Sequence, residues 1–514
     1  MKILSAILFL ATAPLIAQSK WASIGPDGHL HYSETSRGDH IPDYSISGYE
    51  GGGVALPQVP ATIHLSPGTG DDTAAIQSAI DKVSAMPLKG HFRDAVQLSA
   101  GTFHCSGTLH ITSSGVVLRG AGEGKNGTII EMTGAPHRAM EVTGKRVEAL
   151  PGAKTNFADA YVPFGTRTVH VSSTEGFHVG DTVRITKPVT PEWIAFMGMD
   201  KLTRPGRSEH WIGDAALRIR RRIIAMDDNA MTFDVALMDS YDAKFTGPVP
   251  VERVDVVGQI DHVGVEGLYI KAPARSIALE DPHYDGIFVR DAVDSWLQHL
   301  ELEDVTDGLR LELGTQRITV ARVDVTQHKP ITSSAKNFQF TANGSQLLFD
   351  RITGSGKSVF YMATQAREQG PVVVLHCHFE GDGRIEPHQR WATGLLIDNC
   401  EVPHGGINMV NRGIMGSGHG WTIGWPVVWN SSAAYLTIQQ PPGTLSWSIG
   451  NRGEQQMLPI PTADRGWFRG KPLPQGIIES QGKPVKPQSL YLEQLYERLG
   501  PQALKNIGYT TQDR

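Results

Sequence analysis

The sequence predicts an all-β fold: a parallel β-helix with a helix capping its N-terminal end and a β-rich insertion. Short apolar runs bounded by Gly and Ser recur through the chain. In the second half they start 21 to 32 residues apart, at Leu297, Ile318, Leu347, Val373, Leu395 and Val427. Repeats of 20–50 residues are typical of solenoids, in which each turn completes its core against the next. One amphipathic helix precedes these runs, and a stretch of longer strands interrupts them.

Residues 1–17 are predicted to be a signal peptide. Lys2 gives a positive start, residues 3–16 are apolar, and Ala17 is a small residue before the expected cleavage point. The apolar stretch is shorter than the ~20 residues that a membrane helix needs. We therefore expect an exported protein, secreted or periplasmic, with no membrane segment; a buried first strand is the alternative.

Residues 18–149 are expected to hold an N-terminal arm, the capping helix and the first turns of the solenoid. The arm is polar and rich in Gly and Pro. Asp71 and Asp72 then supply N-cap carboxylates for a helix that ends before Pro87. Three apolar residues recur along this helix at i, i+4 and i+7: Ile76, Ile80 and Val83. We expect this apolar face to seal the open end of the solenoid.

Residues 150–255 are predicted to form an inserted β-rich subdomain, because their strands are longer and are separated by Pro-rich or charged segments. The apolar segment 193–199 suits either a sugar cleft, with Trp193 as the contact, or the core, which we favour. The basic run Arg218-Ile-Arg-Arg-Arg222 is interpreted as a solvated strand face rather than a binding site.

Residues 256–453 are assigned to the main β-helix, and residues 454–514 to a Pro-rich tail whose last helix caps the far end. Such a cap protects the exposed strand edges of a terminal turn. Cys377 and Cys400 are 23 residues apart, so they should fall on adjacent turns. We favour inward stacking of the two thiols over a disulfide bond.

The charge balance argues against a nucleic-acid partner. The chain has 47 Lys and Arg residues against 53 Asp and Glu residues, a net charge of −6. Nucleic-acid-binding proteins normally show a basic excess. A local basic groove is compatible with this total. We expect the protein to be a monomer.

Three segments near the start of the solenoid resemble one known superfamily. They are Gly70-Asp-Asp-Thr-Ala-Ala-Ile-Gln-Ser-Ala-Ile80, Ala95-Val-Gln-Leu-Ser-Ala-Gly-Thr-Phe103 and Ser114-Gly-Val-Val-Leu-Arg-Gly-Ala-Gly122. The first is similar to the capping helix of the pectate-lyase-like β-helix superfamily, and the others to its first turns. The resemblance implies a right-handed parallel β-helix. The superfamily includes lyases, hydrolases, epimerases and non-enzymatic phage proteins, so function has to be argued from the site.

The segment Glu386-Pro-His-Gln-Arg-Trp391 is the first candidate site. It places an acid, an imidazole, a guanidinium and an indole within one predicted loop. Arg390 can hold a carboxylate through two parallel hydrogen bonds, and Trp391 offers a flat face to a sugar ring. Glu386 and His388 are the acid–base candidates. The alternative is a structural loop in which Arg390 pairs with Glu386 and Trp391 packs on the solenoid.

A second candidate cluster, residues 411–421, follows one or two turns later. Its four glycines permit tight turns and close approach of a ligand. Its candidate residues are Asn411, Arg412 and Trp421 for substrate binding and His419 for proton transfer. Lys357 and Tyr361 lie one turn before the first cluster, as a substrate contact and a reserve base.

No cofactor or metal is predicted. His376 and His378 flank Cys377 on one strand and should share a face, but no carboxylate lies at zinc-ligand spacing. Residues 281–285 and 301–304 offer hard oxygen ligands, so Ca²⁺ is retained as a candidate ion there. A solvated acidic face is the favoured interpretation of both segments.

Two reactions suit these residues. β-Elimination on a uronic acid needs a cation that neutralises the carboxylate and a base that removes the C5 proton, as Arg390 and His388 can do. Glycoside hydrolysis needs two carboxyls. Residues 418–424 are similar to a piece of the polygalacturonase family, but the place of that family's Asp pair reads Asp398-Asn399.

We predict a lyase acting on an acidic polysaccharide, with the two loops facing one groove. A glycoside hydrolase and a non-catalytic glycan-binding solenoid are the alternatives.

Overall fold

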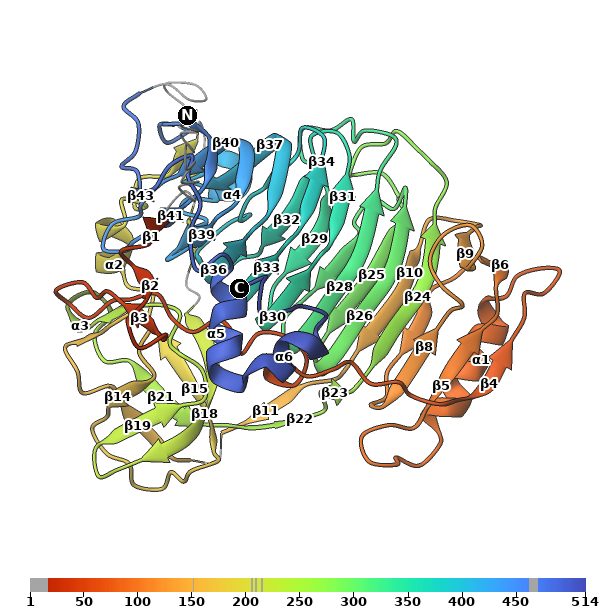
Figure 1. Cartoon of the computed structure of the whole chain (residues 1–514), viewed down its shortest axis with the longest axis horizontal. Coiled ribbons are helices and arrows are strands. Elements are labelled where there is room, and N and C mark those ends of the chain that lie inside the picture. The colour runs from red at the N-terminus through yellow and green to blue at the C-terminus, as the bar shows by residue number, and fades with distance from the viewer. Residues whose placement is uncertain (1–16, 151, 205–206, 209, 214–215, 462–469) are drawn as a thin grey trace, which may run out of the picture.

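The computed structural model describes residues 17–150, 152–204, 207–208, 210–213, 216–461 and 470–514 (Figure 1). The predicted signal peptide lies, except for its last residue, outside the described residues. No helix in the described part of the chain is long and apolar enough to cross a membrane.

The predicted all-β class and parallel β-helix are confirmed, and the solenoid is right-handed. Its strands form one 28-stranded sheet system in which neighbouring turns pair in parallel, as the stacked arrows of Figure 1 show. Each complete turn contributes strands to three ladders. Inward side chains of successive turns stack on one another, for example Leu347 beside Val372 and Val372 beside Leu395.

The first ladder consists of β4 (Ala61–Leu65), β5 (Asp94–Leu98), β8 (Val116–Arg119), β24 (Gly264–Lys271), β26 (Ala292–Glu303), β28 (Gln316–Thr326), β30 (Ser345–Asp350), β33 (Gln369–Leu375), β36 (Ala392–Asp398), β39 (Val427–Trp429), β41 (Trp447–Ile449) and β43 (Ile477–Glu479). The second consists of β6 (Gly101–Cys105), β9 (Thr128–Met132), the second halves of β24, β26 and β28, β31 (Thr353–Ser355), β34 (His378–Glu380) and the starts of β37 (Glu401–Met409), β40 (Ser432–Ile438) and β42 (Arg452–Gln455). The third consists of β7 (Leu109–Ile111), β10 (Arg138–Thr143), β25 (Asp285–Arg290), β27 (Leu309–Leu311), β29 (Phe338–Ala342), β32 (Phe360–Thr364), β35 (Arg384–Ile385) and the ends of β37, β40 and β42.

Helix α1 (Thr73–Ser84) covers the open end of the first turns. Its buried residues Ile76, Ile80 and Val83 belong to the same core as the inward side chains of the solenoid. The capping chemistry differs from the expectation for Asp72, whose carboxylate accepts from the loop amides of Gly68 and His104 rather than from the helix. The Asp71 carboxylate accepts from the Thr73 amide at the start of the helix.

Replacing Ile80 by Asp should destabilise the protein by several kcal/mol, because it places an unpaired carboxylate in this core. The Ile80 side chain is 1% exposed. Denaturant titration followed by circular dichroism measures the loss. The matched control is Lys82→Asp on the exposed face of the same helix. An unchanged unfolding midpoint for Ile80→Asp would show that α1 does not seal the solenoid.

Cys377 and Cys400 are free, buried and adjacent on successive turns, so inward stacking is confirmed over a disulfide bond. The expectation that His376 and His378 share a face is wrong. His376 has a left-handed backbone (φ 49°) at the bend between β33 and β34, which breaks the alternation of the strand. The His376 ring contacts Tyr509, whereas His378 bonds to Glu380 and Glu401.

The inserted segment leaves the solenoid after β10 and returns before β23 (Ile260–Asp261). Strands β11 (Val147–Ala149) and β22 (Asp255–Val257) pair at its base. Its six-stranded antiparallel sheet runs in the order β12 (Lys154–Asn156), β21 (Pro250–Arg253), β15 (Thr182–Lys187), β18 (Leu217–Met226), β19 (Ala230–Phe233) and β14 (Thr168–His170). Although it departs from an early turn, it packs beside the late turns β36 to β41 (Figure 1).

The C-terminal helices α5 (Leu490–Leu499) and α6 (Pro501–Asn506) do not cap the far end, as the sequence had suggested. They lie across the outer face of the first ladder (Figure 1). The reason is apolar complementarity, since Leu490, Leu492 and Leu495 pack against outward aliphatic side chains of that ladder. Asp398 anchors the helix by accepting from the Ser489 hydroxyl and the Tyr491 amide.

Candidate functional site

The two predicted loops lie side by side on adjacent turns. The Arg390 amide donates to the His419 carbonyl, and the Trp391 amide donates to the Trp421 carbonyl, each at 3.0 Å. The juxtaposition that the sequence suggested is therefore present in the fold. What the individual side chains contact, however, differs from the expectation.

The three indoles considered as sugar contacts are buried. Trp391 is 1% exposed, and Trp193 and Trp421 are also buried, in one cluster with Trp211. The Trp421 indole donates to the Met197 carbonyl at 3.0 Å. These residues join the insertion to the solenoid, which is the core role favoured for the segment around Trp193, and they offer no platform to a ligand.

A buried ion pair lies beneath this cluster. The Lys187 ammonium is 2.8 Å from the Asp239 carboxylate, and both side chains are almost fully buried. Asp239 also accepts from the indoles of Trp391 at 2.9 Å and Trp425 at 3.3 Å. Because Lys187 and Asp239 lie in the insertion and both indoles in the solenoid, the pair holds the two parts together.

The polar residues of the predicted clusters are largely engaged with one another. Glu386 is buried and accepts from Asn408 at 2.9 Å, with Arg384 and Arg412 within 3.4 Å. Arg412 also donates to the His388 carbonyl, and burial lowers its pKa. Arg390 and Asn411 also make hydrogen bonds within the two loops. Arg390 donates to the carbonyl and hydroxyl of Ser417, and Asn411 accepts from the Gly413 amide. The contacts are structural, but the expected partner differs: Glu386 lies near Arg384 and Arg412, and Arg390 bonds to Ser417.

Tyr361 is not suited to act as a base. It lies inside the solenoid, where its hydroxyl donates to the Glu380 carbonyl and accepts from the Gly383 amide. Burial raises the pKa of this phenol to about 12. Lys357 is exposed in the turn between β31 and β32, at a different corner of the solenoid from the predicted loops.

His388 keeps the features of a base. Its Nδ1 is 3.0 Å from Gln365 Oε1, and an amide oxygen only accepts, so Nδ1 carries the proton and Nε2 keeps a lone pair. The ring packs against Phe338 and Phe360 and meets His419 edge-on at 4.7 Å between ring centres. Burial, together with nearby Arg and His residues, lowers the pKa of His388 to about 2. The imidazole is therefore neutral at ordinary pH.

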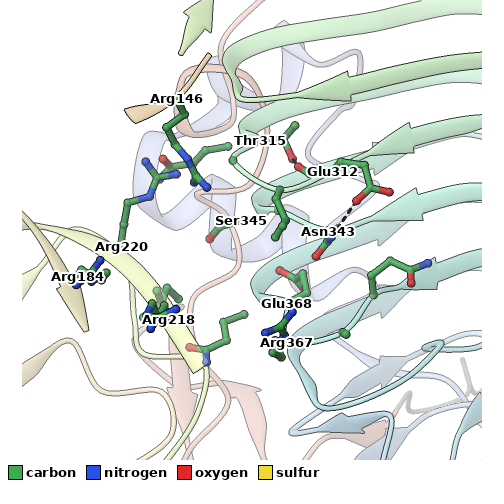
Figure 2. Close-up of a pocket in the computed structure, with 18 of the residues that line it drawn as sticks. Arg146, Arg184, Arg218, Arg220, Glu312, Thr315, Asn343, Ser345, Arg367 and Glu368 are labelled. Carbon is green, nitrogen blue, oxygen red and sulfur yellow. Dashed lines mark hydrogen bonds between the residues drawn. The ribbon is translucent and has the colours of Figure 1, made fainter. Parts of the chain in front are cut away.

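Beside His388 lies a cleft of about 570 Å³ between the insertion and the solenoid (Figure 2). Gln365, the partner of His388, and Gln389, its neighbour, both line it. One wall comes from β15, β18 and the segment before β11. The other comes from the loops that follow β27, β29 and β32. The charged lining residues are Arg146, Arg184, Arg218, Arg220, Arg310, Arg367, Glu148, Glu312 and Glu368.

The cleft carries an excess of positive charge, with six arginines against three glutamates. Some are paired: Arg310 holds Glu312 through two nitrogens at 3.1 and 2.7 Å, and Arg184 is 2.7 Å from Glu252. Among the residues that the structure describes, no ion pair is found for Arg218 or Arg367. Arginines from both walls thus line one cleft, and Figure 2 shows Arg218 on the insertion side, Arg367 on the solenoid side, and Arg220 beside Arg146.

This cleft was not predicted from the sequence. Arg218 and Arg222 are exposed, as expected of a solvated strand face, but Arg218 and Arg220 also line the cleft, and Arg222 does not. Arg221, on the opposite face of the strand, is buried and donates to the carbonyls of Ala236 and Gly370. Side chains alternate between the two faces of a strand, so the sequence could have separated Arg218 and Arg220 from Arg221. Nothing in the sequence connected them with the loops after β27, β29 and β32.

Two of the three glutamates that line the cleft differ in their hydrogen bonds. Glu312 accepts from Arg310 and from the Asn343 side-chain amide at 3.0 Å. Glu368 is 4% exposed, and neither of its carboxyl oxygens has a hydrogen-bond partner among the described residues. Burial raises the pKa of Glu368 well above the ordinary value, and the attraction of Arg221 offsets this only in part.

The acidic segments considered for Ca²⁺ lie elsewhere on the solenoid. Ligand atoms of Glu303, Asp304 and His328 fall within 4.8 Å of one another. These groups already have protein partners, since Tyr269 donates to Glu303 and the His328 ring bonds to Asp304. The arrangement suits a hydrogen-bonded surface network as well as it suits an ion.

No protein-family model and no curated protein matches the sequence. Among solved structures, tailspike protein gp49 from Pseudomonas phage LKA1 is similar, with 13% identity and a TM-score of 0.39 over 75% of this chain and 69% of that one. Tailspike gp61 of Pseudomonas phage phi297 has 11% identity and a TM-score of 0.36 over 76% and 69%. The A-module of Azotobacter vinelandii mannuronan C-5 epimerase AlgE6 has 10% identity and a TM-score of 0.35 over 81% and 97%. Likenesses this distant carry no argument about activity.

Proposed function

We propose that this protein is an exported enzyme that binds an acidic polysaccharide in the arginine-lined cleft and cleaves it by β-elimination. The observation that carries the proposal is that arginines of the insertion and of the solenoid line one cleft together with Gln365, the hydrogen-bond partner of His388. Guanidinium groups recognise carboxylates with charge and geometry together. Uronic-acid polymers present such carboxylates along their length.

In this mechanism the arginines neutralise the uronate carboxylate, which acidifies the C5 proton. His388 Nε2 accepts that proton, because it keeps its lone pair while Nδ1 donates to Gln365. The imidazole is a weak base in the free protein, because burial lowers its pKa and the nearby arginines and His419 lower it further. A bound carboxylate offsets the part that comes from the arginine charges.

Hydrolysis is the second candidate, because two carboxyl groups, those of Glu312 and Glu368, line the cleft. Such a pair is the usual acid–base set of glycosidases. A screen of purified protein on pectin, alginate, glucuronan, ulvan and glycosaminoglycans separates the two reactions. New ultraviolet absorbance together with reducing ends supports elimination, and reducing ends alone support hydrolysis. No product from any of these polymers would contradict both.

Replacing Arg218 and Arg220 together by Gln should weaken substrate binding about 100-fold. A charge-assisted hydrogen bond contributes ~1.5 kcal/mol, which is about tenfold per arginine. The measurement is KM, or Kd by calorimetry, on the polymer that the screen identifies. Arg222→Gln is the matched control, because Arg222 lies on the same strand but does not line the cleft. Equal effects of the two changes would place binding elsewhere.

A further inference from the structure

Glu368 is a buried acid that has no part in binding a substrate carboxylate. It lies in the loop between β32 and β33, beside Arg367, and Figure 2 shows it at the solenoid wall of the cleft. Buried polar side chains in proteins are nearly always hydrogen-bonded. Both carboxyl oxygens of Glu368 nevertheless have no partner among the described residues.

Arg221, whose charge attracts this carboxyl group, does not form an ion pair with it. Arg221 comes from β18 and is buried, but its guanidinium donates to the carbonyls of Arg220, Ala236 and Gly370. No ion pair between Arg221 and Glu368 is found in the described part of the chain. An unpaired carboxyl in such a place is held as the neutral acid, with a proton to donate. Burial raises its pKa accordingly.

We infer that Glu368 protonates the departing glycosidic oxygen during cleavage. The inference rests on the proposed function and adds the acid that the reaction needs. In elimination, the C5 proton passes to His388 Nε2, the C4=C5 double bond forms and the C4–O4 bond breaks. The O4 oxygen then takes the proton of Glu368. Exchange with solvent afterwards returns one proton to Glu368 and removes one from His388.

The fold brings the acid and the residue that orients the base to one loop. Gln365, which holds His388, lies three residues before Glu368 in the same connection between β32 and β33, and both line the cleft. His388 lies on the next turn, and strands of neighbouring turns are ~4.8 Å apart. If the reaction is hydrolysis, the same oxygen departs and needs the same proton.

Glu368→Gln tests the inference directly, because Gln resembles the neutral acid in shape but cannot donate a proton to the leaving oxygen. On the polymer that the screen identifies, we expect a 10²–10⁴-fold loss of kcat. On an oligosaccharide of that polymer whose leaving sugar is replaced by nitrophenol, we expect a loss of less than tenfold, because nitrophenolate departs without a proton. Glu493→Gln, which changes a buried acid on α5, should leave both rates unchanged.

A purely structural role predicts different results. If Glu368 were an ion-pair partner of Arg221, Glu368→Gln would lower the unfolding midpoint and reduce both rates equally. Near wild-type cleavage of the polymer would also overturn the inference while leaving the proposed function intact. An inactive wild-type protein would overturn both.

Should Glu368→Gln fail to fold, the wild-type pH profile decides. Glu368 acts when protonated, so kcat/KM should fall as alkaline pH removes its proton. Burial lowers the pKa of Arg221 beside it to about 10, so an alkaline fall counts for Glu368 only where the nitrophenol substrate does not share it. An alkaline fall of equal size on both substrates, or none while the protein stays folded, would exclude Glu368 as the acid.

Discussion

Replacing His388 by Ala is expected to lower kcat on the acidic polysaccharide by about 10²–10⁴-fold, the usual contribution of a general base. The reason is the loss of the Nε2 lone pair, which the hydrogen bond from Nδ1 to Gln365 keeps available. KM should change little, because the arginines that hold the substrate carboxylate remain. Steady-state kinetics on the polymer identified by screening measures both constants.

His378→Ala is the matched control for this change. That histidine lies on β34, bonded to Glu380 and Glu401 and away from the cleft, so its removal should leave kcat unchanged. A His388→Ala protein with wild-type kcat would show that another group takes the proton. Equal losses in kcat and in fold content by circular dichroism would indicate a structural role instead.

The same histidine should make stability depend on pH. Its pKa is about 2 in the folded protein and about 6.5 in an unfolded chain. Between these values the unfolded chain binds a proton that the folded protein does not, so stability falls as pH falls from about 6.5. Denaturant titrations at pH 7 and pH 4.5 should therefore show a smaller difference for His388→Ala than for wild type.

Asp239→Ala is expected to cost about 3–5 kcal/mol of stability, the usual penalty for breaking a buried ion pair from one side. The change leaves the Lys187 ammonium buried without its counter-charge. It also removes the acceptor for the indoles of Trp391 and Trp425, which join the insertion to the solenoid. Urea titration monitored by tryptophan fluorescence reports the loss.

Two comparisons sharpen this test. The double change Lys187→Met with Asp239→Ala should recover part of the loss, because no unpaired charge then remains buried. Lys154→Ala removes the surface pair with Glu252 and should cost less than about 1 kcal/mol. If Asp239→Ala behaved like Lys154→Ala, the buried pair would not hold the insertion in place.

The sequence alone indicated the features that depend on short-range regularity. The repeat of short apolar runs predicted stacked turns, since each run buries its inner face only against its neighbours. The spacing of Ile76, Ile80 and Val83 predicted the capping helix, and the 23-residue separation of Cys377 and Cys400 predicted their stacking. The adjacency of the two loops around His388 and His419 followed from the same repeat.

Only the tertiary structure decided which side chains meet a ligand. The insertion departs after β10 yet packs on much later turns, and no local pattern records where a folded subdomain docks. That docking buries Trp391 and Trp421, which the sequence suggested as sugar contacts, together with Trp193. It also brings Arg218 and Arg220 opposite Arg367 and Glu368. Each turn of the repeat buries its inner face against the next turn, so the sequence of the repeat is enough to predict the stack. The cleft depends on contacts between the insertion and turns that lie far from it in the chain, which the repeat does not specify.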